Sequence, residues 1–323
     1  MAHWKERGVD LAAYHTDASA DDVDEVRRAL GIEQLILWGE SYGTHLSLAY
    51  LRRHGLHVAR AVLLRVEGPD HTLKLPGTTQ RHLERLHQLV AADPSICAEL
   101  PDLLGAVQGL LARLAAEPVR VVAPHEGGEE SVVLGPFDLQ YWLANALGLT
   151  FEMRDVPAAI LAMTRGDWST LGAWAIDARR GETGSAMALA MDCASGASAA
   201  RLARIEAERR DPANLLGDAV NLPYPGACAP CGTPALGDGF RAAFQSEVPV
   251  LFVSGDLDAR TPPENVDEIR AGFVCGAHVL VRNAGHEPIE MQSLEFRALL
   301  HDFLAGKPIA SRTIELPAPR FGR

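Results

Sequence analysis

The chain has 323 residues, of which 47% are hydrophobic, and it carries a formal net charge of −12. This length can bury a substantial core in one large domain or two. The acidic balance disfavours nucleic acid as a partner, and no basic run or basic–aromatic patch appears. No stretch reaches the ~18 uncharged apolar residues of a membrane-spanning helix, so no membrane partner is expected. The first seven residues lack the pattern of a signal peptide, so the chain as given is expected to be cytoplasmic.

The first predicted element is a helix from about Ser19 to Leu30. The segment from Ser19 to Asp22 resembles a capping box, and Val23, Val26 and Leu30 recur at helical spacing. Gly31 is expected to end the helix because glycine readily takes the backbone conformation of a helix terminus.

A serine motif follows this helix. The apolar run Leu35 to Trp38 predicts a strand, Gly39-Glu40-Ser41-Tyr42-Gly43 comes next, and residues 44–51 read as a helix. G-x-S-x-G between a strand and a helix is the nucleophile elbow of α/β-hydrolases. The turn is tight, so a side chain at either glycine is expected to collide with neighbouring backbone. The motif predicts that the Ser41 hydroxyl stands clear of the sheet as a nucleophile.

The pattern changes after the next strand, which is predicted at residues 58–66. Its uninterrupted apolar centre is typical of a parallel strand covered on both faces. From residue 67 to 246 the sequence favours helices and Gly/Pro loops, with no strand for the main sheet. This insertion is interpreted as a helical cap that shapes the substrate pocket and excludes water. The predicted domains are therefore 1–66, 67–246 and 247–323. The helices expected in the cap cover residues 81–92, 103–115, 137–147, 157–163 and 199–210.

The C-terminal part supplies two candidate acids and a candidate base. A buried strand at residues 248–253 is followed by Asp256 and Asp258, and a last strand at 277–281 is followed by His286. Loops after the carboxyl ends of strands are where α/β enzymes place their chemistry. Asp258 is the predicted acid, with Asp256 as an alternative that could instead hold the loop. His278, within the strand, is the rival to His286.

These three residue types in this order fit serine catalysis. A serine hydroxyl is a poor nucleophile at neutral pH, so His286 is expected to take the proton of Ser41 and return it to the leaving group. Asp258 is expected to orient the imidazole and stabilise the imidazolium. The chain order Ser, Asp, His is that of a triad in this fold.

The cysteines do not predict a metal site. Cys228 and Cys231 have C-x-x-C spacing, but no second pair or His pair lies near them, so neither zinc nor another metal is expected. A disulfide with Cys193, or buried thiols, are the two remaining interpretations. No P-loop and no G-x-G-x-x-G after a strand occurs, so no cofactor is predicted.

The motifs together resemble one known family. The segments that carry the resemblance are Tyr14–Asp17, Trp38–Thr44, Ala92–Cys97 and Gly255–Pro262, and the chain is similar along essentially its whole length to the proline iminopeptidase and tripeptidyl aminopeptidase family. The resemblance implies an α/β-hydrolase fold and a serine mechanism that releases residues or short peptides from the N-terminus of peptides. It assigns Ser41 as nucleophile, Asp258 as orienting acid and His286 as general base.

The residues that bind the substrate are predicted separately from these motifs. Members of the family use acids of the cap to bind the free amine of the substrate, and Glu40 and Glu152 are the candidate substrate-binding residues, with Asp155 beside the latter. A small carboxylic ester is the alternative substrate, because fold and triad are shared and only the pocket decides.

The chain departs from the family before the elbow. Four strands and an oxyanion loop are expected before the elbow strand, but the residues before Leu35 predict one helix and no strand. The backbone N–H of Tyr42 is the one oxyanion donor assigned. The resemblance therefore implies a chain equivalent to the C-terminal two-thirds of such a hydrolase, with a sheet incomplete at its N-terminal side and an apolar edge at Leu35 to Trp38. A third interpretation is a catalytically impaired fragment that lacks the oxyanion loop.

Overall fold

The computed structural model describes residues 2–125, 127–181, 185–229 and 231–322. These residues form two compact units, termed the sheet unit and the helical unit. The predicted boundaries at residues 66 and 246 do not coincide with them, because three segments expected in the cap, 67–74, 184–203 and 221–246, group with the sheet. The sheet unit comprises Met1–Lys74, Gly184–Ala203 and Asn221–Leu316, and the helical unit comprises Leu75–Thr183, Arg204–Val220 and Pro317–Arg323.

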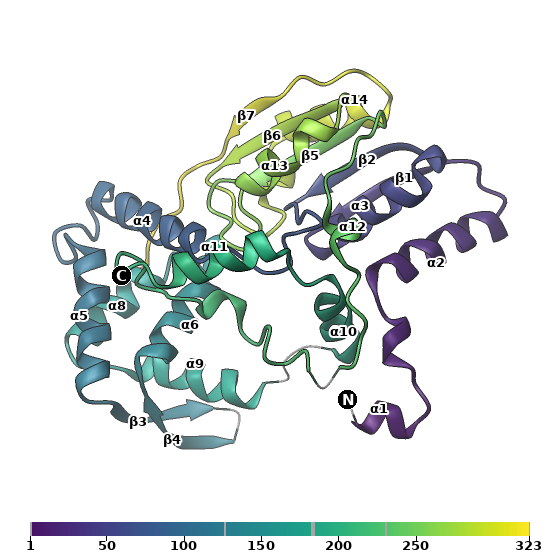
Figure 1. Ribbon diagram of the computed structural model, residues 1–323. Coiled ribbons are helices and arrows are strands. Elements are labelled where there is room, and N and C mark those ends of the chain that lie inside the picture. The colour runs from purple at the N-terminus through teal and green to yellow at the C-terminus, as the bar shows by residue number, and fades with distance from the viewer. Residues whose placement is uncertain (1, 126, 182–184, 230, 323) are drawn as a thin grey trace. The chain divides into compact units, whose positions relative to one another are not determined.

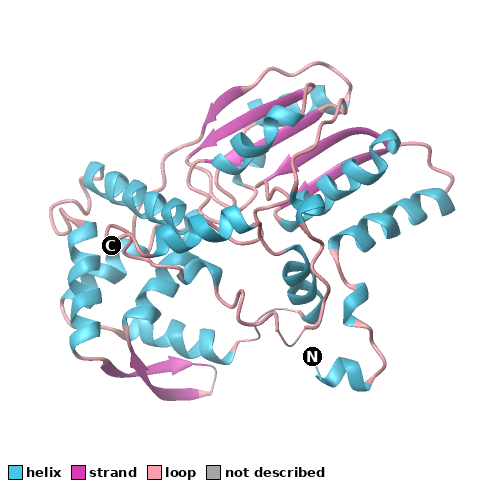
Figure 2. Cartoon of the chain, viewed as in Figure 1, coloured by secondary structure: helices cyan, strands magenta, loops and turns pink. Residues whose placement is uncertain are grey.

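The sheet unit is built on five parallel strands in the order β1-β2-β5-β6-β7 (Figures 1 and 2). No described residue from 67 to 246 adds a strand to this sheet, as the sequence predicted. The expectation that residues 277–281 form the last strand is wrong, because β7 follows and pairs with β6. The strands are β1 (Leu35–Glu40), β2 (Val58–Leu64), β5 (Val250–Gly255), β6 (Gly276–Arg282) and β7 (Arg312–Glu315).

Helices and short 3-10 helices complete the sheet unit. The second helix begins at Thr16, three residues earlier than predicted, because the Nδ1 atom of His15 accepts a hydrogen bond from the Ala18 N–H and caps it. The elements are α1 (Ala2–Glu6), η1 (Leu11–Ala13), α2 (Thr16–Ala29), α3 (Tyr42–His54), η2 (Gly55–His57), α10 (Ala186–Ser195), α12 (Asp238–Arg241), α13 (Glu264–Ile269), η4 (Arg270–Gly272), η5 (Ile289–Gln292) and α14 (Leu294–Leu304).

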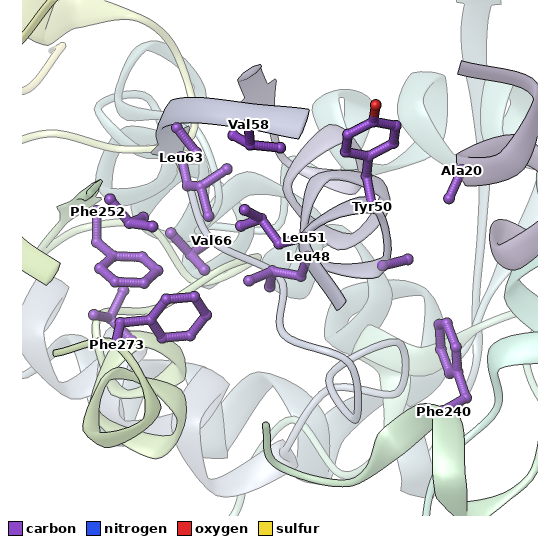
Figure 3. Packing of buried hydrophobic residues seen from close by; sticks show 14 residues of the cluster. Ala20, Leu48, Tyr50, Leu51, Val58, Leu63, Val66, Phe240, Phe252 and Phe273 are labelled. Atoms are coloured by element: carbon purple, nitrogen blue, oxygen red, sulfur yellow. The ribbon is translucent and has the colours of Figure 1, made fainter. Parts of the chain in front are cut away.

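Apolar clusters cover both faces of the sheet. Successive side chains of a strand point to opposite faces, so Leu63 of β2 joins Leu48 and Tyr50 of α3 and Phe252 of β5 (Figure 3). On the other face, alternate strand residues pack on Phe296 and its neighbours in α14. Burying one such large apolar side chain contributes roughly 1.5–3 kcal/mol. These two clusters hold the strand ends, from which the functional loops emerge, in a fixed arrangement.

The first strand lies at an edge of the sheet. Leu35 and Leu37 pack on the α3 face, whereas the side chains of Ile36 and Trp38 on the other face are 50% and 45% exposed. The apolar exposed edge that the sequence predicted is therefore present.

The helical unit is mainly helical but also contains a hairpin that the sequence analysis missed. Strands β3 (Val119–His125) and β4 (Gly128–Leu134) pair antiparallel as a separate two-stranded sheet. The alternation of Val119, Val121 and Ala123 with polar or exposed neighbours was the available signal. The helices are α4 (Pro76–Ala92), α5 (Leu103–Ala116), α6 (Pro136–Ala146), α7 (Thr150–Met153), α8 (Val156–Thr164) and α9 (Ser169–Arg180).

Two elements contain residues of both units, namely α11 (Ala199–Arg209) and η3 (Ala219–Asn221). The five helices predicted for the insertion are present, with ends within five residues of the expected ones. In the described part of the chain, no helix is both long and apolar enough to cross a membrane.

Candidate active site

Ser41 occupies the sharp turn between β1 and α3. Its backbone has φ 52° and ψ −124°, a conformation that residues other than glycine rarely adopt. The Ser41 N–H donates a hydrogen bond of 3.1 Å to the carbonyl oxygen of Leu64 at the end of β2, which holds the turn on the sheet.

The two glycines of the motif differ in whether a side chain would fit at their positions. A Cβ atom at Gly39 would lie 2.5 Å from the carbonyl oxygen of Gly43, so only glycine fits there. At Gly43 a Cβ atom would meet nothing within 4 Å. The expectation that both positions exclude a side chain is therefore wrong for Gly43, where a Cβ atom would have open space.

Ser41, His286 and Asp258 form a continuous hydrogen-bonded chain. The Nε2 atom of His286 lies 2.9 Å from Ser41 Oγ, and its Nδ1 atom lies 2.9 Å from Asp258 Oδ2. A carboxylate can only accept, so Nδ1 carries a proton and Nε2 is the acceptor for the serine hydroxyl. The structure thus brings together three residues that are up to 245 positions apart in the sequence.

Asp258 is fully buried and extensively hydrogen-bonded. Burial favours the neutral acid, but hydrogen bonds from His286 and Thr261 outweigh it and hold the pKa of Asp258 below its ordinary value. The backbone N–H groups of Arg260 and Thr261 donate to Oδ1 at 2.9 Å each, and the Thr261 hydroxyl donates to Oδ2 at 2.7 Å. The site therefore contains a fixed carboxylate.

Thr261 is a site residue that the sequence analysis quoted but did not assign. Its Oγ1 atom also lies 3.1 Å from His286 Nδ1, so it contacts both the acid and the base. Its position three residues after Asp258, at the start of Thr-Pro-Pro, was the available signal.

Tyr42 places a backbone donor beside the nucleophile. It is the first residue of α3, where the N–H groups of the first turn have no carbonyl partner within the helix and the helix dipole favours negative charge. Its phenol is enclosed, and burial raises the pKa of Tyr42 to about 12. The hydroxyl lies 3.1 Å from Thr16 Oγ1 and donates to Met191 Sδ at 3.5 Å.

The two alternatives to the acid and the base have other partners. Asp256 accepts hydrogen bonds from the Asn283 N–H at 2.5 Å and from Arg282 Nη1 at 3.2 Å, so it ties the loop after β5 to the end of β6. His278 lies in β6 with its Nε2 atom 3.2 Å from Ser254 Oγ. Neither residue contacts Ser41 or His286 through these bonds.

The candidate substrate-binding acids lie in different units. Glu40 is in the sheet unit, and its carboxylate accepts from Trp38 Nε1 at 3.0 Å and from Arg65 Nη2 at 2.7 Å. Glu152 lies in α7 of the helical unit and is partly buried, and Asp155 follows it as an exposed residue near Arg154. Glu40 is thus engaged by protein groups.

A second serine–histidine pair lies close to the elbow helix. His45 donates from Nδ1 to the carbonyl oxygen of Gly68 at 3.0 Å and accepts at Nε2 from Ser195 Oγ at 3.1 Å. Both side chains are buried, and burial lowers the pKa of His45.

A disulfide joins Cys193 of α10 to Cys228, which is the first of the two interpretations of the C-x-x-C pair. Cys231 is a buried thiol whose Sγ atom lies 3.8 Å from that of Cys193. Disulfides persist in oxidising compartments and are rare in the cytosol, so this bond does not support the expected cytoplasmic location. Within the described ranges, no group of three or more His, Cys, Asp or Glu is arranged to hold a metal ion.

Comparisons with known families bear on this site. Residues 3–96 match a family model described as the alpha/beta hydrolase fold, and residues 222–307 match one described as a TAP-like protein. The first match contains Ser41, and the second contains Asp258 and His286. With the parallel sheet and its elbow, these matches show the predicted α/β-hydrolase fold and support a hydrolase. No curated protein sequence matches the chain.

Solved structures give only a distant likeness. A thermophilic esterase from Thermogutta terrifontis is 16% identical over 91% of this chain and 74% of its own, with a TM-score of 0.37. A meta-cleavage product hydrolase from Pseudomonas fluorescens IP01 is 15% identical over 91% and 73%, with a TM-score of 0.39. An epoxide hydrolase from Bacillus megaterium is 14% identical over 92% and 78%, with a TM-score of 0.35. Similarity at this level carries no argument about substrate.

Proposed function

We propose that this protein is a serine hydrolase that cleaves a carboxylic amide or ester through an acyl-enzyme on Ser41. The observation that carries the proposal is the hydrogen-bonded chain from Ser41 through His286 to Asp258 at a strained turn. A serine whose hydroxyl donates to an imidazole that is backed by a buried carboxylate is an activated nucleophile.

Each group has a step in the proposed reaction. The Ser41 oxygen attacks the substrate carbonyl carbon while His286 Nε2 takes its proton, and Asp258 stabilises the resulting imidazolium. The Tyr42 N–H donates to the oxyanion that forms on the carbonyl oxygen. His286 then gives the proton to the leaving amine or alcohol. A water molecule, deprotonated in turn by His286, attacks the acyl-enzyme and releases the acid and free Ser41.

Within this class, we propose an aminopeptidase that releases N-terminal residues or short peptides. The support is the family resemblance of the elbow and the C-terminal motif, together with the TAP-like match over residues 222–307. A carboxylic ester hydrolase is the alternative, because the triad serves either substrate and the pocket decides.

The test begins with Ser41. The wild-type chain is expected to react covalently with a fluorophosphonate probe, and the Ser41→Ala variant is expected not to react, as measured by intact mass. Turnover is then compared for an aminoacyl nitroanilide, its N-acetylated analogue and an acyl ester. An aminopeptidase prefers the free amine over the acetylated amide, whereas an ester hydrolase turns over mainly the ester. Absence of any Ser41-dependent reaction would mean that the proposed function is wrong.

The substrate amine provides a second test, centred on Glu152. If its carboxylate binds the amine, Glu152→Gln should raise KM for the aminoacyl nitroanilide by roughly tenfold, which is the value of one lost charged hydrogen bond. KM for the acyl ester should stay unchanged. Asp155→Asn is the matched comparison variant, because Asp155 is an exposed acid three residues further along the chain. Equal effects of both variants would contradict the role of Glu152.

The oxyanion donors determine how fast this chain reacts. One donor, the Tyr42 N–H, is assigned, and the loss of one of two donors costs about 10² to 10³ in turnover. Turnover that relies on this donor alone is therefore expected to be slow. Serine-dependent turnover at ordinary enzyme rates, about 1 to 10³ per second, would show that another N–H completes the oxyanion site.

A further inference from the structure

A buried arginine follows strand β2 and lies beside the proposed site. Arg65 is 4% exposed, which is unusual for an arginine. Its backbone has φ 55°, in the left-handed region that residues other than glycine rarely adopt. Such conformations persist when the surrounding structure determines them, and they cluster at functional sites.

The guanidinium of Arg65 contacts two separate segments of the chain. Its Nη2 atom donates to Glu40 Oε2 at 2.7 Å, and its Nη1 atom donates to Glu290 Oε1 at 2.9 Å. The Nη1 atom also lies 3.4 Å from the carbonyl oxygen of Glu287. The side chain of Glu290 is 3% exposed, so this pair is shielded from solvent.

These partners flank the nucleophile and the base. Glu40 directly precedes Ser41, and Glu287 directly follows His286. One side chain therefore joins the turn that carries the nucleophile to the loop that carries the base.

The backbone around Arg65 makes matching contacts. Leu64 accepts from the Ser41 N–H at 3.1 Å, and the Arg65 N–H donates at 2.8 Å to Val253 of β5, the strand that leads to Asp258. The end of β2 is thus bonded to both the elbow and the strand that carries the acid.

The charges stabilise the ion pairs of Arg65 with Glu40 and Glu290. Burial opposes the charged guanidinium, but the carboxylates of Glu290 and Glu40 outweigh it and raise the pKa of Arg65. Burial likewise opposes ionised Glu40, but hydrogen bonds from Trp38 and Arg65 lower the pKa of Glu40. A planar guanidinium can donate to two acceptors in fixed directions, which a lysine ammonium cannot match.

We propose that Arg65 is a positioning residue that holds the Ser41 turn and the His286 loop at the spacing their hydrogen bond requires, acting through Glu40 and Glu290. This inference rests on the proposed serine hydrolase function. It gives Glu40 a role in supporting the nucleophile rather than in binding the substrate. The competing explanation is an ion-pair cluster that stabilises the fold and leaves the chemistry unaffected.

The variants Arg65→Met, Arg65→Lys and Glu290→Gln separate these explanations. Arg27→Met is the matched control, because Arg27 is also buried, donates to Asp24 at 2.7 Å and donates to the carbonyl oxygen of Ile32 at 2.7 Å. The fraction folded is measured by circular dichroism, and kcat and KM for an acyl ester are measured at temperatures where each variant is folded. The rate of phosphonylation of Ser41 is measured in parallel.

For Arg65→Met we expect kcat and the phosphonylation rate to fall about 10²-fold with KM within about twofold, because a misplacement of ~1 Å costs about that much. Arg65→Lys should recover part of the loss, and Arg27→Met should keep wild-type kcat. If Arg65→Met does not fold, Arg65→Lys and Glu290→Gln replace it. Both are expected to lower kcat and the phosphonylation rate by a smaller factor. Folded variants with wild-type kcat would overturn the positioning role alone. A wild-type chain with no Ser41-dependent reaction would overturn the proposed function and this inference with it.

Discussion

The pair formed by Ser41 and His286 can be compared with the pair formed by Ser195 and His45. The oxygen–nitrogen distances are similar, at 2.9 Å and 3.1 Å. Their surroundings differ in access and in charge. Ser41 is partly exposed on a strained turn, whereas Ser195 is fully buried in the last turn of α10.

The second nitrogen of each imidazole shows the other difference. His286 Nδ1 faces the buried carboxylate of Asp258, while His45 Nδ1 donates to the neutral carbonyl of Gly68. An imidazolium at His286 would be stabilised by a full charge, but one at His45 would meet only a dipole. A serine–histidine hydrogen bond therefore does not by itself indicate catalysis, because access to the serine and a carboxylate behind the imidazole are also required.

The sharpest test of this comparison removes each serine. Ser41→Ala is expected to lower kcat/KM by at least about 10⁴-fold, since the nucleophile is lost. Ser195→Ala should leave kcat/KM within a few-fold and lower the free energy of unfolding by about 1–3 kcal/mol, because buried His45 loses its partner. Activity assays and urea unfolding measure the two effects. Equal activity losses would remove the distinction between the pairs.

The acids extend the test. Asp258→Asn should lower kcat by roughly 10⁴-fold, since an amide cannot stabilise the imidazolium and favours the wrong tautomer. Asp256→Asn, the matched variant, should change kcat by no more than a few-fold, because Asp256 bonds Asn283 and Arg282 rather than His286. Steady-state kinetics with an acyl ester check both. A larger loss in Asp256→Asn would reassign the acid.

Removal of the disulfide tests the same comparison through the free energy of unfolding. Cys193 lies two residues before Ser195 in α10, and its bond to Cys228 closes a segment with a sequence separation of 35. Cys228→Ser should lower the free energy of unfolding by about 2–4 kcal/mol. The kcat of the folded protein should stay unchanged, because the hydrogen bonds that link Ser41, His286 and Asp258 do not involve either cysteine. A loss of kcat in the fully folded variant would indicate that α10 supports the Ser41 site.

The pH dependence of stability gives the smallest expected difference. Burial lowers the pKa of His45, so the unfolded chain binds more protons as the pH falls below about 6.5, and the stability from this pair is lost from there downward. The pKa of Asp258 is lowered because its hydrogen bonds outweigh burial, so its contribution is lost only as the pH falls below about 3.9 and through the folded-state value.

Urea unfolding between pH 7.5 and 4.5 checks the contribution of His45, with His45→Gln as the comparison variant. The wild type should lose up to about 1.4 kcal/mol per pH unit more than the variant below pH 6.5. Burial raises the pKa of Asp192 to about 6, which contributes with the opposite sign, so the difference between the two proteins isolates His45. Parallel curves for both proteins would contradict the prediction.

Local patterns were sufficient for much of the fold. The elbow, the strands on either side of it and five helices of the insertion follow from apolar spacing and from glycine, because these signals act within a few residues of one another. The β3–β4 hairpin and β7 were missed, since a short alternating segment of the chain does not reveal whether a partner strand is available.

The sequence by itself determined which residues could carry the chemistry: a serine in a strand–turn–helix motif, and acids and histidines on loops after later strands. Only the tertiary structure decided which of them meet. Asp258 rather than Asp256 faces His286, and Arg65 reaches Glu290 across 225 positions in the chain. The physical reason is that hydrogen bonds of about 3 Å depend on the register and twist of parallel strands, which long-range packing sets and no local pattern encodes.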